Sequence, residues 1–239
     1  MLSIFKREFK NYFTSVIGYV FFTLFMIFYG VFFYISIVGG ETSGIVSSGM
    51  SNFFGMIYIV LVLLIPVLTM RLLSEERKQK TDQLLLTSPV GLGEIVLGKF
   101  FSAFAIYSIA VGTTVFFALI IAAYGKLNFV EYIGMVVGIL LIGAALIAVG
   151  EFISALTESQ VVAAFATFGA IILTYVPVVL SSIVSSSLLK TLLGLISLHT
   201  RYTDFTSGLF DIGNILFYIS FTAVFLFLTV RVMERRRWS

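Results

Sequence analysis

The sequence predicts an all-α integral membrane protein with six transmembrane helices and both chain ends in the cytoplasm. The chain is 59% hydrophobic and only 11% charged, with 26 Phe among 239 residues. A soluble fold of this size could not bury that much apolar surface. Apolar runs of about 20 residues, the length that crosses a bilayer, recur along the chain. Lys and Arg cluster in the segments that six such crossings would leave on one side.

Each predicted span contains an apolar run long enough to form a helix about 30 Å in length. The spans cover residues 16–38, 53–73, 100–124, 132–155, 161–181 and 215–232. Pro177 falls within the fifth span. Its missing N–H group and its ring are expected to kink or end that helix.

The basic residues give the orientation. Of the 15 Lys and Arg residues, only Lys126, Lys190 and Arg201 fall on the side opposite the chain ends. Cytoplasmic loops carry an excess of Lys and Arg, so both ends and the segment 74–98 are predicted to be cytoplasmic. The expected location is the cell membrane, as a multi-pass protein.

Residues 1–15 have two faces at helical spacing. Leu2, Phe5, Phe9, Tyr12 and Phe13 form the apolar face, and Lys6, Arg7, Lys10 and Asn11 form the polar one. This pattern favours an amphipathic helix that lies in the headgroup layer and leads into the first span like an elbow. The alternative is a basic flanking sequence that only orients the span.

The segment 182–214 is too long for a simple connector. It contains an apolar face made by Leu188, Leu189, Leu192, Leu193 and Ile196. This face is too short to span, so we expect a re-entrant or interfacial helix on the outer side. Leu188, Leu192 and Ile196 are candidates for a pathway or gate.

Catalytic motifs are incomplete. Gly93–Lys99 matches the first seven positions of a phosphate-binding loop, but Phe100 replaces the hydroxyl residue that would bind magnesium. No strand is expected before it. The chain has one His and no Cys, so thiol, Ser-His-Asp and His/Cys metal chemistry lack their residues. We therefore expect no enzyme activity, no cofactor or metal in this chain, and no nucleic-acid partner.

Two further titratable residues are candidates for a functional role. Glu151 lies inside the fourth span, and an intramembrane carboxylate is a functional candidate, although it could reach the interface or pair with a neighbouring helix. His199 could sense pH or contact a transported ligand. The alternative for His199 is a hydrogen-bonded structural role.

The order of these parts resembles the membrane subunits of type-2 ABC exporters, known as ABC-2 type permeases. The resemblance covers essentially the whole chain. Two stretches, 74–90 and 199–213, are similar to the bacterial gliding-motility-associated branch. Members commonly carry a Gly-Thr-Leu-Glu-like sequence where this chain has Lys80-Thr-Asp-Gln83. The resemblance implies a bacterial plasma-membrane protein.

The resemblance also implies how the chain would work. In this family the segment between spans two and three carries a coupling helix, here residues 81–92, that docks on a separate ATP-binding subunit. ATP and magnesium would be bound in that partner. The residues implied in coupling are Glu75, Glu76, Arg77, Asp82, Gln83, Leu84, Leu85 and Leu86. Further implied partners are a second permease subunit, identical or paralogous, membrane lipid, and an auxiliary extracytoplasmic protein.

Two other function classes fit parts of the sequence. An ion-coupled carrier or channel commonly has ionisable or unwound segments near the membrane midplane, and here only Glu151 and Pro177 are candidates. A membrane scaffold that recruits cytosolic partners would also need a charged, water-facing segment. The exporter subunit is the preferred interpretation.

Overall fold

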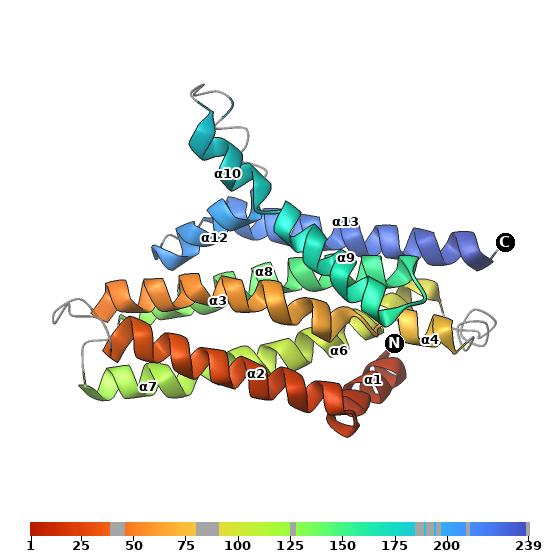
Figure 1. Cartoon of the computed structure of the whole chain (residues 1–239), viewed down its shortest axis with the longest axis horizontal. Coiled ribbons are helices and arrows are strands. Elements are labelled where there is room, and N and C mark those ends of the chain that lie inside the picture. The colour runs from red at the N-terminus through yellow and green to blue at the C-terminus, as the bar shows by residue number, and fades with distance from the viewer. Residues whose placement is uncertain are drawn as a thin grey trace.

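A computed structural model of the chain describes residues 1–38, 46–79, 91–124, 128–184, 189, 194, 197–208 and 211–237. Within these ranges the regular structure is helical (Figure 1). The first part of the chain forms α1 (Leu2–Thr14), α2 (Val16–Phe33), the π-helix η1 (Tyr34–Val38), α3 (Val46–Thr69) and α4 (Ser74–Lys78). It continues with α6 (Leu92–Gly112), α7 (Thr114–Tyr124), α8 (Phe129–Leu156), α9 (Gln160–Leu173), α10 (Val176–Ile183), α12 (Leu198–Thr206) and α13 (Ile212–Arg237).

Six helical stretches in the described residues are long and apolar enough to cross a membrane, which confirms the predicted number. They are Val16–Ser36, Met50–Lys78, Leu92–Ala123, Phe129–Leu156, Gln160–Ser181 and Ile212–Arg236. Both chain ends and α4 lie at one end of the bundle (Figure 1). We refer to this as the terminal end.

The third span differs from its predicted start. α6 begins at Leu92, whereas the span was expected to begin at Phe100. Residues 92–98 therefore form the first two turns of a bundle helix and do not belong to a connecting loop. Ile95 and Val96 are fully buried there, so their packing extends the helix on the N-terminal side of Lys99. The stretch that matched a phosphate-binding loop is helical.

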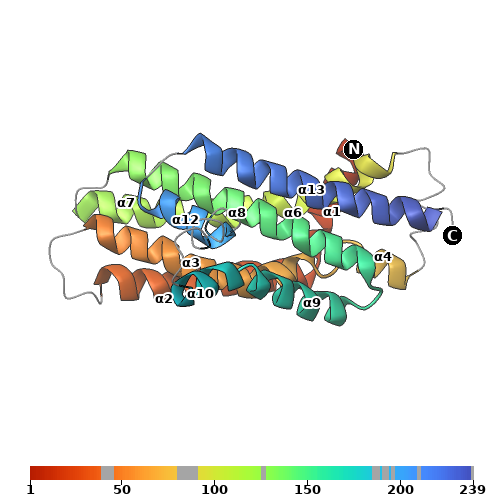
Figure 2. The same cartoon turned by 90° about the horizontal axis from the view of Figure 1, so that it is seen from above.

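The long helix α8 runs through the middle of the bundle (Figure 2). It packs against α3, α6, α9, α12 and α13. Its glycines allow these close contacts within the chain: a Cβ at Gly143 would lie 2.2 Å from the Tyr107 ring of α6, and one at Gly150 would lie 2.2 Å from Thr69 of α3. The core of the fold is thus built around α8.

The fifth span is interrupted, as its proline predicted. α9 ends at Leu173, and α10 restarts at Val176 with Pro177 in its first turn. A proline is tolerated there because the N–H groups of a first turn have no intrahelical partner. α10 leans away from the bundle in Figure 1.

The short helix α12 runs antiparallel to α3 in the half of the bundle away from the terminal end. Its Tyr202 hydroxyl donates to the carbonyl of Phe54 at 2.6 Å, and Ser51 donates to the carbonyl of Thr206 at 2.6 Å. On the other side of α12, Tyr218 of α13 donates to the carbonyl of Leu198 at 2.6 Å. Side chains of two spans therefore hold both ends of this nine-residue helix.

Candidate functional site

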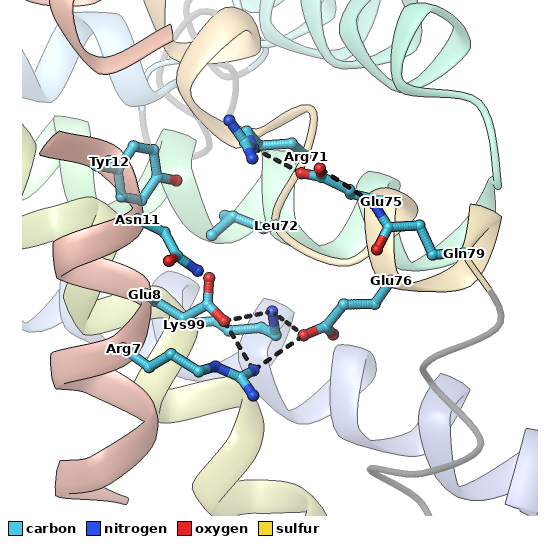
Figure 3. A pocket seen from close by; sticks show the side chains of 10 residues that line it. All are labelled: Arg7, Glu8, Asn11, Tyr12, Arg71, Leu72, Glu75, Glu76, Gln79 and Lys99. Carbon is cyan, nitrogen blue, oxygen red and sulfur yellow. Dashed lines mark hydrogen bonds and ion pairs between the residues drawn. The ribbon is translucent and has the colours of Figure 1, made fainter. Parts of the chain in front are cut away.

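A cavity of about 580 Å³ opens at the terminal end between α1, α4 and α6 (Figure 3). Nine of its ten lining residues carry a polar or charged side chain. The walls are made by Arg7, Glu8, Asn11, Tyr12, Arg71, Leu72, Glu75, Glu76, Gln79 and Lys99. We call this the charged cavity.

One wall of the charged cavity is a four-residue ion-pair network. The Lys99 ammonium lies 2.9 Å from the Glu76 carboxylate and 3.4 Å from that of Glu8. The Arg7 guanidinium lies 3.0 Å from Glu8 and 3.3 Å from Glu76. Lys99 is only 1% exposed, whereas the Arg7 side chain is 53% exposed. The network thus runs from the protein interior to its surface and joins three helices.

The opposite wall carries a second ion pair. Arg71, in the turn that follows α3, contacts Glu75 of α4 at 2.7 Å. Nearby, the Tyr12 hydroxyl donates to the carbonyl of Leu68 at 3.0 Å, which ties α1 to α3. Burial raises the pKa of the Tyr12 phenol, so this group remains a neutral donor. The Arg71–Glu75 pair and the network around Lys99 lie on opposite sides of Leu72 and Asn11 (Figure 3).

The turn between α3 and α4 is fixed by α8. The Ser154 hydroxyl accepts from the backbone N–H groups of Leu73 and Ser74, both at 3.1 Å, and donates to the carbonyl of Met70 at 3.2 Å. Arg77 points away from the charged cavity. It pairs with Glu158 at 2.9 Å and donates to the carbonyl of Leu156 at 2.9 Å. α4 is therefore held from both sides.

The structure brings together only part of the predicted coupling set. Glu75 and Glu76 line the charged cavity, while Arg77 lies on the other side of α4. Five predicted coupling residues lie outside the described residues. They are Asp82, Gln83, Leu84, Leu85 and Leu86.

Sequence reasoning missed Arg7, Glu8 and Lys99 as site residues. Arg7 was assigned only to the polar face of an amphipathic helix, and Lys99 only to the phosphate-loop-like stretch 93–99 and to the basic residues on the side of the chain ends. The signal for Lys99 was available, since it is the one charged residue between Glu94 and Lys126. A cation isolated in so long an apolar run requires a carboxylate partner.

Glu151 is fully buried in α8, and neither of its carboxylate oxygens has a hydrogen-bond partner in the described part of the chain. It does not reach the interface, which was one of the alternatives. Among the charged groups, Lys99 acts on it electrostatically. Glu151 is not one of the residues that line the charged cavity.

His199 lies near the start of α12 among tyrosine rings. Its ring centre is 4.6 Å from that of Tyr58 and 4.8 Å from that of Tyr175. Within the described ranges its Nδ1 has no hydrogen-bond partner, so that part of the expected structural role is not met. Burial lowers the pKa of His199. The other outer-segment candidates, Leu188, Leu192 and Ile196, lie outside the described residues.

The fold and the site define a class, a six-span helical membrane protein with a charged cavity at the end where its termini lie. Residues 2–238 match the family described as ABC-2 family transporter protein, and the chain belongs to that family. It is a transmembrane permease of ABC transporter type. The family resemblance seen in the sequence is confirmed at this level. A comparison with curated proteins gave no match.

Proposed function

We propose that this chain is the membrane-spanning subunit of an ATP-driven exporter and that a separate subunit binds and hydrolyses ATP. The family membership supports transport across a membrane. We further propose that the chain ends and the segment 74–98 face the cytoplasm of a bacterial cell and that a second permease subunit completes the pathway. The narrower similarity to gliding-motility-associated permeases is part of this proposal.

The observation that carries the coupling proposal is the way both ends of residues 79–91 are anchored. Glu76 lies in α4 just before this segment, and Lys99 lies about two turns into α6, the helix that follows it; their ion pair measures 2.9 Å. Arg7 and Glu8 add α1 to the same network. A partner that pulled on the segment would therefore act on the ends of α3 and α6 together and displace α1, because the network links all three.

A double substitution in the segment tests this proposal. Leu85 and Leu86 would each contribute about 1.5–3 kcal/mol if fully buried in a groove of the partner. We expect Leu85→Ser with Leu86→Ser to release the co-expressed ATP-binding subunit in copurification, or to leave its ATP hydrolysis uncoupled from transport. The matched control is Phe129→Ser with Val130→Ser, which changes two exposed apolar residues of α8. Normal copurification and normal transport by the Leu variant would contradict the coupling role.

The proposed orientation has its own test. The chain has no Cys, so one introduced thiol reports on one position. Gln79 and Ser207 are both exposed and lie toward opposite ends of the bundle. We expect Ser207→Cys to react with a membrane-impermeant maleimide in intact cells and Gln79→Cys to react only after permeabilisation. The reverse pattern would show that the chain ends face outward.

A further inference from the structure

The charges of the charged cavity balance within its walls. Arg7, Arg71 and Lys99 supply three cations, and three carboxylates accompany them. An anionic ligand would face the carboxylates, and a cationic ligand would face the guanidinium groups. A ligand that carries one positive and one negative group can pair with a carboxylate and a cation of the walls at the same time, so the site keeps no net charge. We propose that the charged cavity binds the zwitterionic headgroup of a phospholipid with a primary ammonium, of the phosphatidylethanolamine type.

The arrangement of the walls suits such a headgroup. The pair of Arg71 and Glu75 occupies one wall, and the network around Lys99 occupies the other (Figure 3). A guanidinium can bind two phosphate oxygens at once through its planar fork. Arg71, whose side chain is 22% exposed, offers this group to an incoming phosphate, and the adjacent Glu75 offers an acceptor for an ammonium.

The size of the cavity is also appropriate. Its volume of about 580 Å³ falls within the range of roughly 300–1,000 Å³ that small-molecule sites occupy. Leu72 is the one aliphatic residue in the lining. The cavity can therefore accommodate a polar headgroup, and we expect the acyl chains to lie outside it.

Surfaces for the acyl chains are present beside the cavity. Phe13 follows Tyr12 in α1 and is 41% exposed. In α6, Leu97 and Phe101 are 36% and 41% exposed at the level of Lys99, on the opposite face of the helix. Helices α1 and α6 thus present apolar side chains to their surroundings at the level of the cavity. A lipid whose headgroup entered the cavity could keep its tails in the bilayer.

The carboxylates select the kind of ammonium. A primary ammonium donates three N–H hydrogen bonds, which the carboxylates can accept. A quaternary ammonium donates none and is bound best by several aromatic faces, whereas Tyr12 is the one aromatic residue in the lining. A lipid with only a phosphate would leave the carboxylates facing a like charge. We therefore expect ethanolamine lipids to bind more tightly than choline or glycerol lipids.

A methylation series tests the inference on the unmodified protein. Native mass spectrometry of the delipidated chain would measure binding of short-chain phosphatidylethanolamine, its mono- and dimethyl derivatives, phosphatidylcholine and phosphatidylglycerol. Affinity should fall with each methyl group, by about tenfold over the series, as N–H donors are lost while the charge is kept. Equal affinity across the series, or tightest binding of phosphatidylglycerol, would overturn the proposal.

Soluble glycerophosphoethanolamine distinguishes a lipid from a free metabolite. It has the same headgroup without the tails, so it should compete with the lipid only weakly. If it binds as tightly as the lipid, the ligand is a soluble zwitterion and the lipid assignment fails.

A paired substitution locates the binding site. Arg71→Gln with Glu75→Gln removes one cation and one carboxylate together and leaves no unpaired charge. We expect about a tenfold loss of affinity for the ethanolamine lipid. Arg231→Gln with Glu234→Gln is the matched control, because it removes an exposed ion pair of α13 outside the cavity. An unchanged affinity in the first variant would place any lipid binding elsewhere. Both measurements use the chain without an ATP-binding subunit, so their failure would leave the coupling proposal standing.

Discussion

Replacing Lys99 by Met should destabilise the protein more than any other single change in the charged cavity. The substitution keeps a side chain of similar length but removes the buried one of the two cations that Glu8 and Glu76 share, and these side chains are 14% and 16% exposed. Removing one partner of a buried ion pair typically costs about 3–5 kcal/mol, because the remaining charge stays buried. The loss should be measured as a lower midpoint of thermal unfolding in detergent.

A second substitution separates charge from packing. Glu76→Gln in the Lys99→Met background removes one of the two carboxylates that lost their contact with Lys99 and leaves Glu8 with Arg7 at 3.0 Å. It should restore part of the lost stability, which a purely steric effect of Met would not allow. Lys10→Met, an exposed residue of α1, is the control and should change stability by at most about 0.5 kcal/mol. A Lys99→Met variant as stable as this control would show that the network does not hold the three helices together.

Adding one methyl group at Gly143 should be the next most damaging change. A Cβ there would lie 2.2 Å from the ring of Tyr107, which is fully buried and donates through its hydroxyl to the carbonyl of Ile139 at 2.5 Å. The ring cannot retreat without breaking that bond. Overpacking of this kind costs about 1–3 kcal/mol or more, so Gly143→Ala should lower both the unfolding midpoint and the yield of folded protein.

Gly169 of α9 is the matched control for this test. Nothing lies within 4 Å of a Cβ at that position. Gly169→Ala should be neutral or slightly stabilising, because Ala has the higher helix propensity by about 1 kcal/mol. If both alanine variants behaved alike, the close contact between α6 and α8 would not be a feature of the folded protein.

The number and approximate places of the spans could be predicted because crossing a bilayer imposes a length and a composition that are visible locally. The boundary at Leu92 could not be found in this way. Lys99 reads as the end of a span when considered alone, and only its partners Glu8 and Glu76, from distant parts of the chain, make it acceptable inside the bundle. Pairing between distant residues has no local signature.

The charged cavity shows the same limit. Glu75 and Glu76 could be predicted as site residues because they are charged residues in an otherwise apolar chain. The same reasoning selected their neighbour Arg77, which lies on the other side of α4 and does not line the cavity. Which side of a five-residue helix faces inward depends on what lies beside it, here α1 on one side and the connection from α8 to α9 on the other. Helical spacing alone does not fix that choice.

The hydrogen bonds that hold α12 in place have a consequence for how the protein folds during membrane insertion. Nine residues cannot cross a bilayer, and the sequence Leu-His-Thr-Arg-Tyr-Thr-Asp-Phe-Thr is too polar to enter lipid unaided. The bond from Tyr202 to Phe54 joins positions 148 residues apart, and the bond from Tyr218 requires a span synthesised after α12 itself. Contacts of such high contact order form late. The insertion machinery can thus insert the spans in order, but the half of this permease away from the terminal end is completed only after the last span has been released into the membrane.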